Sequence, residues 1–552
     1  MKRLLLTVIF LVFAVNAYAA GTTYWGKAGG TGNCGTAVGG ADPKVYIPLP
    51  STAVSCLASG DTLRILAGTY DDFLHDNPGN GGNVNIPSGP GSGLNPYTRI
   101  VGNADGTSIF KPSTGAAGYL IIGFNGGAKS YVEITGLTFD GSLLQPGTDT
   151  RASGAFSTSA DSSGGQHHFW FHHNVITSSN CEYIAFGGTT DTIIEYNTMS
   201  GQSCNATNLS GNSHGIYAGG QSNLSHRITI HGNSIANVKQ YSIHIYPGGE
   251  NMIITKNKIT TSCSTFSGAG IILYGANHVV SNNIIHNNTG PEGNCRGVLI
   301  RSASGSLVYN NTFYGNSGNA IDVEGGVGVL VVCKNNIYSD GAGTSGCTTS
   351  GNNNTSAAAL NFVNAAGADF TLISTSPAIN AGAATISGAT TVAYNGTLPD
   401  IGAYESLGAV TCAIANATPT KVDCTVENNV NPPVLPASSI TGFTVTRDKS
   451  NDAVSANARV GTNGFQITVA DAFTAGQACV VTYAQTGNFT DSALIGNTSN
   501  QELFAGNASV CTNNVSGGAG ATVTQSHVAM YEWTGNEGSG TQIGSTNSAS
   551  AM

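Results

Sequence analysis

Side chains that could do chemistry recur at two positions of a short phrase between residues 182 and 324. The phrase appears as YIAF, GIYA, SIHIY, GIILY, GVLIR and AIDVE, and the side chains follow its first aliphatic residue by one or three places. An imidazole can exchange a proton near neutral pH, a guanidinium can grip a carboxylate with two bonds, and a tyrosine ring offers a flat face to a sugar. The candidate catalytic residues are His244, Arg301, Asp322 and Glu324, and the candidate substrate-binding residues are Tyr217, Tyr246 and Tyr274.

Two further sets of polar residues could bind a metal or transfer protons. Asp322 and Glu324 are two residues apart on one strand face, so they could hold Ca²⁺ or act as paired carboxylates. His172, Glu195 and His231 each precede an Asn by two places in successive repeats, which suits a metal site or an acid–base pair. The alternative for both sets is a polar face exposed to solvent, the ordinary choice for outward side chains.

The elements that position these residues follow from two repeated phrases. The aliphatic residues of the first phrase align, and period-two alternation predicts a strand with one face inward. They are Ile184, Ile216, Ile243, Ile271, Val298 and Ile321. In the second phrase an apolar run meets an Asn, at Asn174, Asn197, Asn233, Asn257, Asn283, Asn311 and Asn335. The steps between these Asn residues are 23, 36, 24, 26, 28 and 24, which predict a solenoid with three short strands per coil. We expect the Asn to form a left-handed corner and to bond its counterparts along the axis.

The repeats and several flanking segments resemble right-handed parallel β-helix proteins of the pectate-lyase-like superfamily. The flanking segments are SGDTLRILAGTY (Ser59 to Tyr70), IPSGPGSGLNPYTRIVGN (Ile86 to Asn103), and SPAINAG (Ser376 to Gly382) with DIGAYE (Asp400 to Glu405). The segments SPAINAG and DIGAYE are similar to the closing segment of "choice-of-anchor Q" proteins. The resemblance covers residues 22–407 and implies the fold more strongly than an activity, since this fold hosts lyases, glycosidases, tailspikes and adhesins. A lyase of this superfamily would carry a Lys or Arg base beside clustered acidic calcium ligands. Here Arg301 has only two carboxylates nearby in the repeat, so that motif is incomplete.

The chain begins with the features of a secretory signal peptide. Lys2 and Arg3 precede an apolar run from Leu4 to Val15, and residues 17–19 read Ala-Tyr-Ala, so we expect cleavage after Ala19. The apolar run is too short to span a bilayer, and no later segment is apolar enough to do so. These features predict a soluble, exported protein.

The organisation expected from the sequence is all-β. Residues 1–19 form the signal peptide, 20–408 a right-handed parallel β-helix, 409–515 a small Ig-like β-sandwich, and 516–552 a flexible Gly/Ser/Thr-rich tail or truncated module. The sandwich assignment comes from strands such as ITGFTVTRD and ACVVTYAQTG, which resemble immunoglobulin-like repeats of bacterial surface proteins.

Cysteine usage and charge limit the partners. The 12 cysteines contain no C-x-x-C motif and are expected to pair with their nearest sequence neighbours. The pairs are Cys34–Cys56, Cys181–Cys204, Cys263–Cys295, Cys333–Cys347, Cys412–Cys424 and Cys479–Cys511. A net charge of -10 disfavours nucleic acid and means that an anionic glycan would need a local positive site.

Two functions from different classes fit these observations. The first is a secreted or cell-surface β-helix that binds an extracellular polysaccharide along the outward strand face and could degrade it as a polysaccharide lyase or glycoside hydrolase. The second is a non-catalytic adhesin or structural β-helix at the cell surface, with the Ig-like domain as a spacer. No cofactor is required by either function, although Ca²⁺ could serve the first.

Overall fold

The computed structural model describes residues 21–515 with internal gaps, together with Tyr531–Glu532 and Thr541–Gln542. The gaps are residues 40–44, 73, 76–84, 93–95, 104, 112–121, 125–128, 144–154, 159–164, 178–181, 203–212, 220–224, 291–293, 325–328, 340–342, 374–375, 388–389, 392–397, 405–409, 427–442, 449, 461–463, 476 and 484–507. The expected signal peptide, Cys181, Cys204 and most of the expected tail lie outside the described residues. The chain divides into two compact units, Met1–Val279 with Asn288–Ala303, and Val280–Asn287 with Ser304–Met552.

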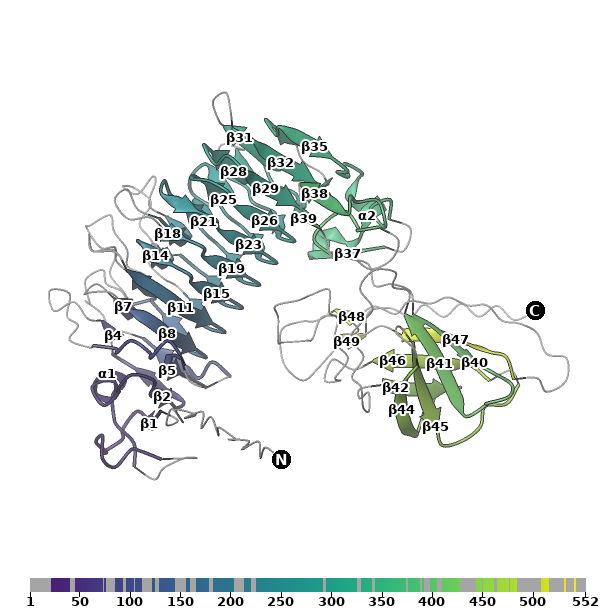
Figure 1. Ribbon diagram of the computed structural model, residues 1–552, viewed down its shortest axis with the longest axis horizontal. Helices are drawn as coiled ribbons and strands as arrows, with labels where there is room; N and C mark the ends of the chain where they lie inside the picture. The colour runs from purple at the N-terminus through teal and green to yellow at the C-terminus, as the bar shows by residue number, and fades with distance from the viewer. Residues whose placement is uncertain are drawn as a thin grey trace, which may run out of the picture. The chain divides into compact units, whose positions relative to one another are not determined.

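Three long parallel sheets, A, B and C, run through the repeats (Figure 1). Sheet A contains β1 (Thr23–Gly26), β2 (Thr62–Ile65), β5 (Thr98–Val101), β8 (Ser130–Thr135), β11 (Gln166–His172), β15 (Ile193–Glu195), β19 (Thr229–His231), β23 (Ile253–Thr255), β26 (Val279–Ser281), β29 (Ser306–Tyr309), β32 (Val331–Lys334) and β35 (Thr349–Gly351), with β14 (Thr189–Thr190), β18 (Ser225–His226) and β22 (Gly249–Glu250) beside them. Sheet B contains β3 (Gly68–Tyr70), β6 (Ser108–Phe110), β9 (Thr138–Asp140), β12 (Val175–Thr177), β16 (Thr198–Ser200), β20 (Ser234–Ala236), β24 (Lys258–Thr260), β27 (Ile284–His286), β30 (Thr312–Tyr314) and β33 (Ile337–Ser339). Sheet C contains β4 (Leu74–His75), β7 (Ile122–Phe124), β10 (Phe156–Thr158), β13 (Glu182–Phe186), β17 (His214–Ala218), β21 (Tyr241–Ile245), β25 (Gly268–Leu273), β28 (Cys295–Arg301), β31 (Ile321–Glu324) and β34 (Thr344–Ser345).

This arrangement confirms the right-handed parallel β-helix with three strands per coil. Helical structure in the described residues is limited to short pieces such as α1 (Pro50–Val54) and α2 (Ala358–Asn361). Inward side chains stack from coil to coil: Phe139 lies between Phe110 and Phe171, with ring centroids 6.0 and 5.9 Å apart. Because these rings are almost completely buried, they supply much of the apolar surface that holds the early coils together.

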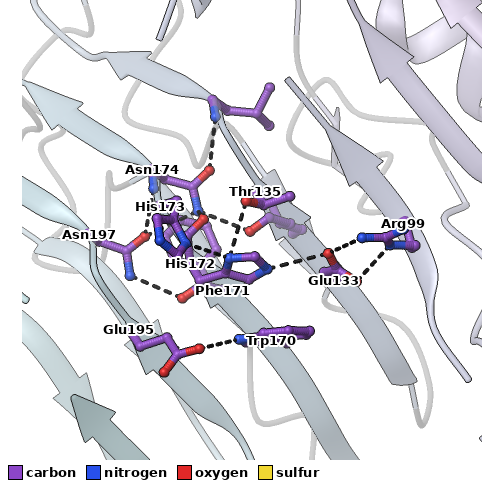
Figure 2. Close-up of polar contacts among 12 residues, drawn as sticks. Arg99, Glu133, Thr135, Trp170, Phe171, His172, His173, Asn174, Glu195 and Asn197 are labelled. Atoms are coloured by element: carbon purple, nitrogen blue, oxygen red, sulfur yellow. Dashed lines mark hydrogen bonds and ion pairs between the residues drawn. The ribbon is translucent and has the colours of Figure 1, made fainter. Parts of the chain in front are cut away.

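The expected Asn ladder is present at the corner between sheets A and B. In the first unit Asn174 donates from Nδ2 to Oδ1 of Asn197 (3.1 Å; Figure 2). Asn197 in turn donates from Nδ2 to Oδ1 of Asn233 (2.9 Å). The expectation that the ladder Asn adopts the left-handed conformation was wrong. The residue before it does so instead, for example His173 and Tyr196, each with φ of 52°. The ladder Asn is thereby free to turn its side chain along the axis.

The second unit carries its own stretch of the ladder and corrects one assignment. Asn311 donates to Oδ1 of Asn336 (3.1 Å), so Asn336 and not Asn335 is the ladder residue of that coil. Asn335 has φ of 55° and occupies the preceding left-handed position. Two adjacent Asn residues made the two registers indistinguishable from the repeat spacing alone.

Five of the six expected disulfides are present, and the sixth, Cys181–Cys204, lies outside the described residues. The five are Cys34–Cys56, Cys263–Cys295, Cys333–Cys347, Cys412–Cys424 and Cys479–Cys511. Cys263 and Cys295 are in the first unit, and Cys295 begins β28 of sheet C. Such bonds persist in oxidising compartments, which fits an exported protein.

Beyond the coils, the second unit contains a closing segment and a small, mostly antiparallel sheet. The closing segment includes α2, β36 (Phe362–Asn364) and β37 (Asp369–Leu372), which share a core with Ile337. The small sheet has the order β43-β42-β46-β47-β40-β41-β45-β44. Its strands are β40 (Val410–Ile414), β41 (Lys421–Val426), β42 (Phe443–Arg447), β43 (Ser450–Asp452), β44 (Val454–Val460), β45 (Gly464–Val469), β46 (Cys479–Tyr483) and β47 (Ala508–Asn513).

The small sheet fits the size and strand pattern of an Ig-like domain and has a core of its own. That core includes Ile414, Val422, Val445 and Ile467, together with both disulfides of the region. The specific Ig-like and choice-of-anchor assignments stay predictions. None of the helices in the described part of the chain is long and apolar enough to cross a membrane.

Candidate functional site

The outward face of sheet C in the first unit brings most of the expected site residues together. The parallel register places Tyr217 beside His244, His244 beside Ile272, and Ile272 beside Leu299 in successive coils. Tyr246 and Tyr274 follow on the same face, with ring centroids 6.2 Å apart. The column order expected from the repeats is therefore the order in the structure.

A third outward column was not expected, because the strands of this sheet break strict alternation. In β13 Tyr183 and Ile184 are successive residues with 0% exposure, and in β21 the same holds for Ser242 and Ile243. Two inward residues in a row turn the preceding residue outward. Glu182, His214 and Tyr241 occupy that preceding position and pair with one another in register.

The third column connects to His244 through a chain of hydrogen bonds. The Nδ1 atom of His214 lies 3.2 Å from Oε1 of Glu182, and its Nε2 atom lies 2.9 Å from Nδ1 of His244. All three side chains are buried. The Nε2 atom of His244 is also buried, and it has no hydrogen-bond partner among the described residues. A buried polar atom without a partner is costly, so it commonly marks a place where a ligand supplies the missing partner.

Four tyrosines surround the His244 ring. The centroid of the imidazole lies 5.2 to 6.1 Å from the rings of Tyr217, Tyr241, Tyr246 and Tyr274. All four tyrosines are partly exposed, whereas His244 is buried. The tyrosines therefore present flat apolar faces and hydroxyl groups to the surface around one imidazole, an arrangement suited to sugar rings.

A buried histidine and an arginine fix the end of this cluster at Tyr274. The Nε2 atom of His278 lies 2.7 Å from the backbone oxygen of Tyr274, and its Nδ1 accepts the N–H of Met252 at 3.3 Å. Burial lowers the pKa of His278 to about 4, so its ring is neutral and can make one bond of each kind. Arg301 donates from Nη1 to the hydroxyl of Tyr274 (3.4 Å) and brings a positive charge to the cluster.

The electrostatics of the cluster favour a proton-accepting role for the Glu182 end. Burial raises the pKa of the Glu182 carboxyl from 4.5 to about 8. Burial also lowers the pKa of His244 well below its usual value, and the nearby His214 and Arg301 add to the effect. The imidazole of His244 is therefore neutral near pH 7, while the Glu182 carboxyl, two hydrogen bonds away, binds a proton strongly.

The proton on Glu182 decides what His244 can do. When the carboxyl is protonated, it donates a hydrogen bond to Nδ1 of His214. The Nε2–H of His214 then donates to Nδ1 of His244, so the proton of the His244 ring is on Nε2. When the carboxyl is ionised, both bonds reverse, and Nε2 of His244 offers a lone pair. The same three residues could thus present a hydrogen-bond donor at lower pH and a proton acceptor at higher pH.

Asp322 and Glu324 are on β31 of sheet C, which belongs to the second compact unit. Their catalytic role stays a prediction. Within the described ranges, no group of three or more His, Cys, Asp or Glu side chains is arranged to hold a metal ion. Glu182, His214 and Tyr241 were missed, although polar residues two places before the aligned aliphatic residue signalled that this position faces outward.

His172, Glu195 and His231 on sheet A have the expected register, but their side chains form hydrogen bonds with other residues. His172 pairs with Glu195 and Glu195 with His231, yet each finds a different partner. His172 lies 3.3 Å from Glu133, Glu195 accepts the indole N–H of Trp170 (2.9 Å; Figure 2), and His231 lies 2.9 Å from the hydroxyl of Tyr196. These residues do not converge on a metal.

Comparison with known proteins supports the fold. A family model described as "Right handed beta helix region" matches residues 214–398. The site on sheet C falls largely within that match, and the three parallel sheets define the chain as a right-handed parallel β-helix protein. A search of curated proteins finds no match.

Several solved structures are similar to the chain at low sequence identity. The pectate lyase Pel9A is 15% identical, with 69% of this chain and 96% of that chain covered and a TM-score of 0.49. The complex of XylC with xylose is 9% identical, with coverage of 59% and 76% and a TM-score of 0.36. The A-module of the Azotobacter vinelandii mannuronan C-5 epimerase AlgE6 is 16% identical, with coverage of 55% and 94% and a TM-score of 0.30.

Proposed function

We propose that this protein binds an extracellular acidic polysaccharide along the outward face of sheet C and removes a proton from it at Nε2 of His244. The observation that carries the proposal is the buried, unpartnered Nε2 atom, which lies at the end of the Glu182–His214–His244 chain. Tyr217 and Tyr246, which flank His244 and are partly exposed, would give a sugar ring a surface to pack on beside the imidazole.

The chain of hydrogen bonds can accept the proton in one concerted movement. With Glu182 ionised, His244 takes a substrate proton on Nε2 and passes its Nδ1 proton to His214, which passes its own Nδ1 proton to the carboxylate. Because the Glu182 pKa is about 8, the carboxylate holds this proton more firmly than an ordinary glutamate would. The relay therefore moves a proton from substrate to a buried carboxylate without leaving a charge on His244.

The charge of Arg301 favours a substrate that carries carboxylates. The chain is acidic overall, with a net charge of -10, so an anionic glycan needs a local positive site. Arg301 supplies one beside Tyr274, close enough to lower the pKa of His244. In a uronic acid, the proton next to the carboxylate is the acidic one. When the base takes this proton, the electrons of the C–H bond form a C=C bond, the neighbouring C–O bond to the leaving sugar breaks, and the leaving oxygen takes a proton from water, which gives an unsaturated sugar.

The test uses the full chain with polygalacturonate and polymannuronate. Cleavage by proton abstraction gives a conjugated double bond that is followed by ultraviolet absorbance, and the rate is expected to rise with pH up to the Glu182 pKa of about 8. His244→Ala should slow the reaction by about 10²–10⁴-fold, the usual worth of a proton-transfer group. His226→Ala is the matched control, because His226 lies on sheet A beside Glu250, and its rate should not change.

Two results would contradict the proposal. An unchanged rate in His244→Ala would remove this residue from the mechanism. Tight binding of an acidic glycan with no product at any pH would favour the non-catalytic function, in which the outward face of sheet C serves adhesion. Loss of binding on replacing Tyr246 would still locate the glycan on this face.

A further inference from the structure

The left-handed corners that flank sheet A carry unusual residues in three early coils. At the N-terminal side of sheet A, within or just before the strand of each coil, one residue in register along the axis has φ between 52° and 59°. These residues are Tyr131, His168, Asp191, Arg227, Asn251 and Asn277. After the strand, the corresponding residues are Gly136, His173, Tyr196, Gly232 and Lys256. Aromatic residues therefore fill one corner beside β8 (Tyr131), both corners beside β11 (His168 and His173) and one corner beside β15 (Tyr196), whereas polar residues or Gly fill the others.

A left-handed backbone is a poor place for a bulky aromatic residue. Asn, Asp, His and Gly adopt this conformation most readily, and the later coils use Asn repeatedly. Tyr131 and Tyr196 are the two tyrosines with positive φ among the described residues, and His168 and His173 stand in register beside them. Such departures concentrate at functional sites, where the residue type serves a purpose other than stability.

The exceptional residues belong to one surface, which we call the aromatic platform. It consists of Tyr97, Tyr131, His168, Trp170, His173 and Tyr196, all partly or fully exposed. Tyr131 stacks on His168 with centroids 4.5 Å apart, and Tyr97 lies 5.8 Å from Tyr131 and 6.0 Å from Trp170. His173 lies 5.2 Å from Tyr196 across the second corner. The buried ring of His172, which stacks on Trp170 and lies 5.1 Å from His173, joins the rings at the first corner to those at the second.

The rings of the platform are held in place before any ligand binds. The indole N–H of Trp170 is bound to Glu195, and its ring stacks on His172 at 4.2 Å (Figure 2). Two glycines make room for rings: a Cβ atom on Gly91 would lie 2.7 Å from the Tyr131 ring, and one on Gly232 would lie 2.6 Å from the Tyr196 ring. Rigid, partly exposed aromatic faces lose little entropy on binding, which favours association.

The charges of this surface are already paired. Arg99 donates two bonds of 2.7 Å to Glu133, and Arg227 donates bonds of 2.6 and 2.7 Å to Asp191. Each guanidinium fork is therefore occupied by a carboxylate of the protein and does not offer a clamp for an anionic ligand. The surface instead combines apolar ring faces with hydroxyl, imidazole and carboxylate groups that can bond to hydroxyls.

We propose that the aromatic platform on sheet A is a second carbohydrate-binding site, which takes a linear, uncharged oligosaccharide by stacking of sugar rings. It differs from the site on sheet C in both position and ligand charge. The expected ligand chemistry is the alternation of apolar ring faces and hydroxyl groups that a neutral sugar chain presents. The protein would then bind a neutral glycan with one face and act on an acidic one with another.

The test follows Trp170, one of only 3 Trp in the chain, by fluorescence of the full-length protein. The probes are linear hexasaccharides of β-1,4-linked glucose and of β-1,4-linked xylose, with hexagalacturonate for comparison. A neutral hexasaccharide should give a saturable change in emission that is absent in Trp170→Phe. Replacing Tyr131 and His168 together by Asn should weaken binding by about tenfold or more, since each lost ring contact removes stacking. The melting temperature should stay the same or rise, because Asn suits a left-handed corner.

Two control variants separate this proposal from the others. Lys256→Asn changes a left-handed corner outside the platform and should leave binding unchanged. His244→Ala should leave the Trp170 response intact even if the site on sheet C loses its activity, so the two proposals fail independently. The second-site proposal is overturned if neither neutral hexasaccharide changes Trp170 emission, or if the double Asn variant binds like the wild type. Stronger binding of hexagalacturonate, lost in Arg99→Gln, would overturn the assignment to a neutral ligand.

Discussion

Replacing Glu182 by Gln should make the protein more stable, and the gain should grow with pH. The carboxyl pKa is 4.5 in its ordinary state and about 8 in the fold, because the group is buried. Between these values the unfolded chain has released the proton while the folded chain keeps it. Rising pH therefore favours the unfolded chain, by about 1.4 kcal/mol for each pH unit in this window. Gln cannot ionise, but its amide can still donate to or accept from Nδ1 of His214.

The size of the effect is best read between pH 6.5 and pH 8. Below about pH 6.5 histidines of the unfolded chain also become protonated, and several native histidines have lowered pKa values, so a second pH effect of opposite sign enters. From pH 6.5 to 8 the wild type should lose about 2 kcal/mol relative to Glu182→Gln, since most of this interval lies below the native pKa. For a unit of this size that corresponds to a melting-temperature difference that widens by about 4 °C.

The measurement is thermal unfolding of the wild type and the variant at both pH values. Glu250→Gln serves as the control, because the Glu250 side chain is 43% exposed and its replacement should give no gain that grows with pH. The reasoning is refuted if Glu182→Gln shifts the melting temperature equally at pH 6.5 and pH 8. In the cleavage assay the same variant should also lose the rise in rate toward pH 8.

Two further predictions concern the coils and the chain beyond them. Asn233→Ala should cost about 3 kcal/mol or more, because Asn233 is buried and bonds to neighbours on both sides. Asn237→Ala, which removes one exposed bond to Ser200, should cost under about 1 kcal/mol in the same melting experiment. A chain ending at Gly408 should fold and keep its glycan affinity, since the strands after it have a separate apolar core. Aggregation of the shortened chain would show that those strands cap the last coil.

The coils could be predicted because each one must bury apolar side chains at the same positions of its strands. An apolar residue must recur wherever a strand faces the core, so the aliphatic and Asn phrases mark the strands and one corner directly. The misplacement at Asn335 shows where this reasoning stops. Asn335 and Asn336 are chemically identical, and it is the structure that distinguishes them, through the hydrogen bond from Asn311 to Asn336 and the left-handed φ of Asn335.

The proton relay could be predicted only in part. His244 and three tyrosines followed from simple alternation, whereas Glu182 and His214 sit where alternation predicts inward side chains. A buried glutamate without a partner would be costly in a core, so its presence at an inward position was itself evidence against strict alternation. Asp322 and Glu324 were chosen by the same alternation, and their role stays a prediction.

In this solenoid, the candidate functional residues are those whose type or position departs from the repeat. A residue that matches the repeat serves the packing common to all coils, so its type carries little information about a ligand. The two proposed sites rest on departures of different kinds. On sheet C, polar side chains stand at a position that alternation reserves for the core, and they form the relay to His244. On sheet A, Tyr131 and His168 occupy a left-handed corner that later coils fill with Asp191, Arg227, Asn251 and Asn277. Each departure costs stability in the absence of a ligand, so neither is expected to persist without a role that the repeat itself does not supply.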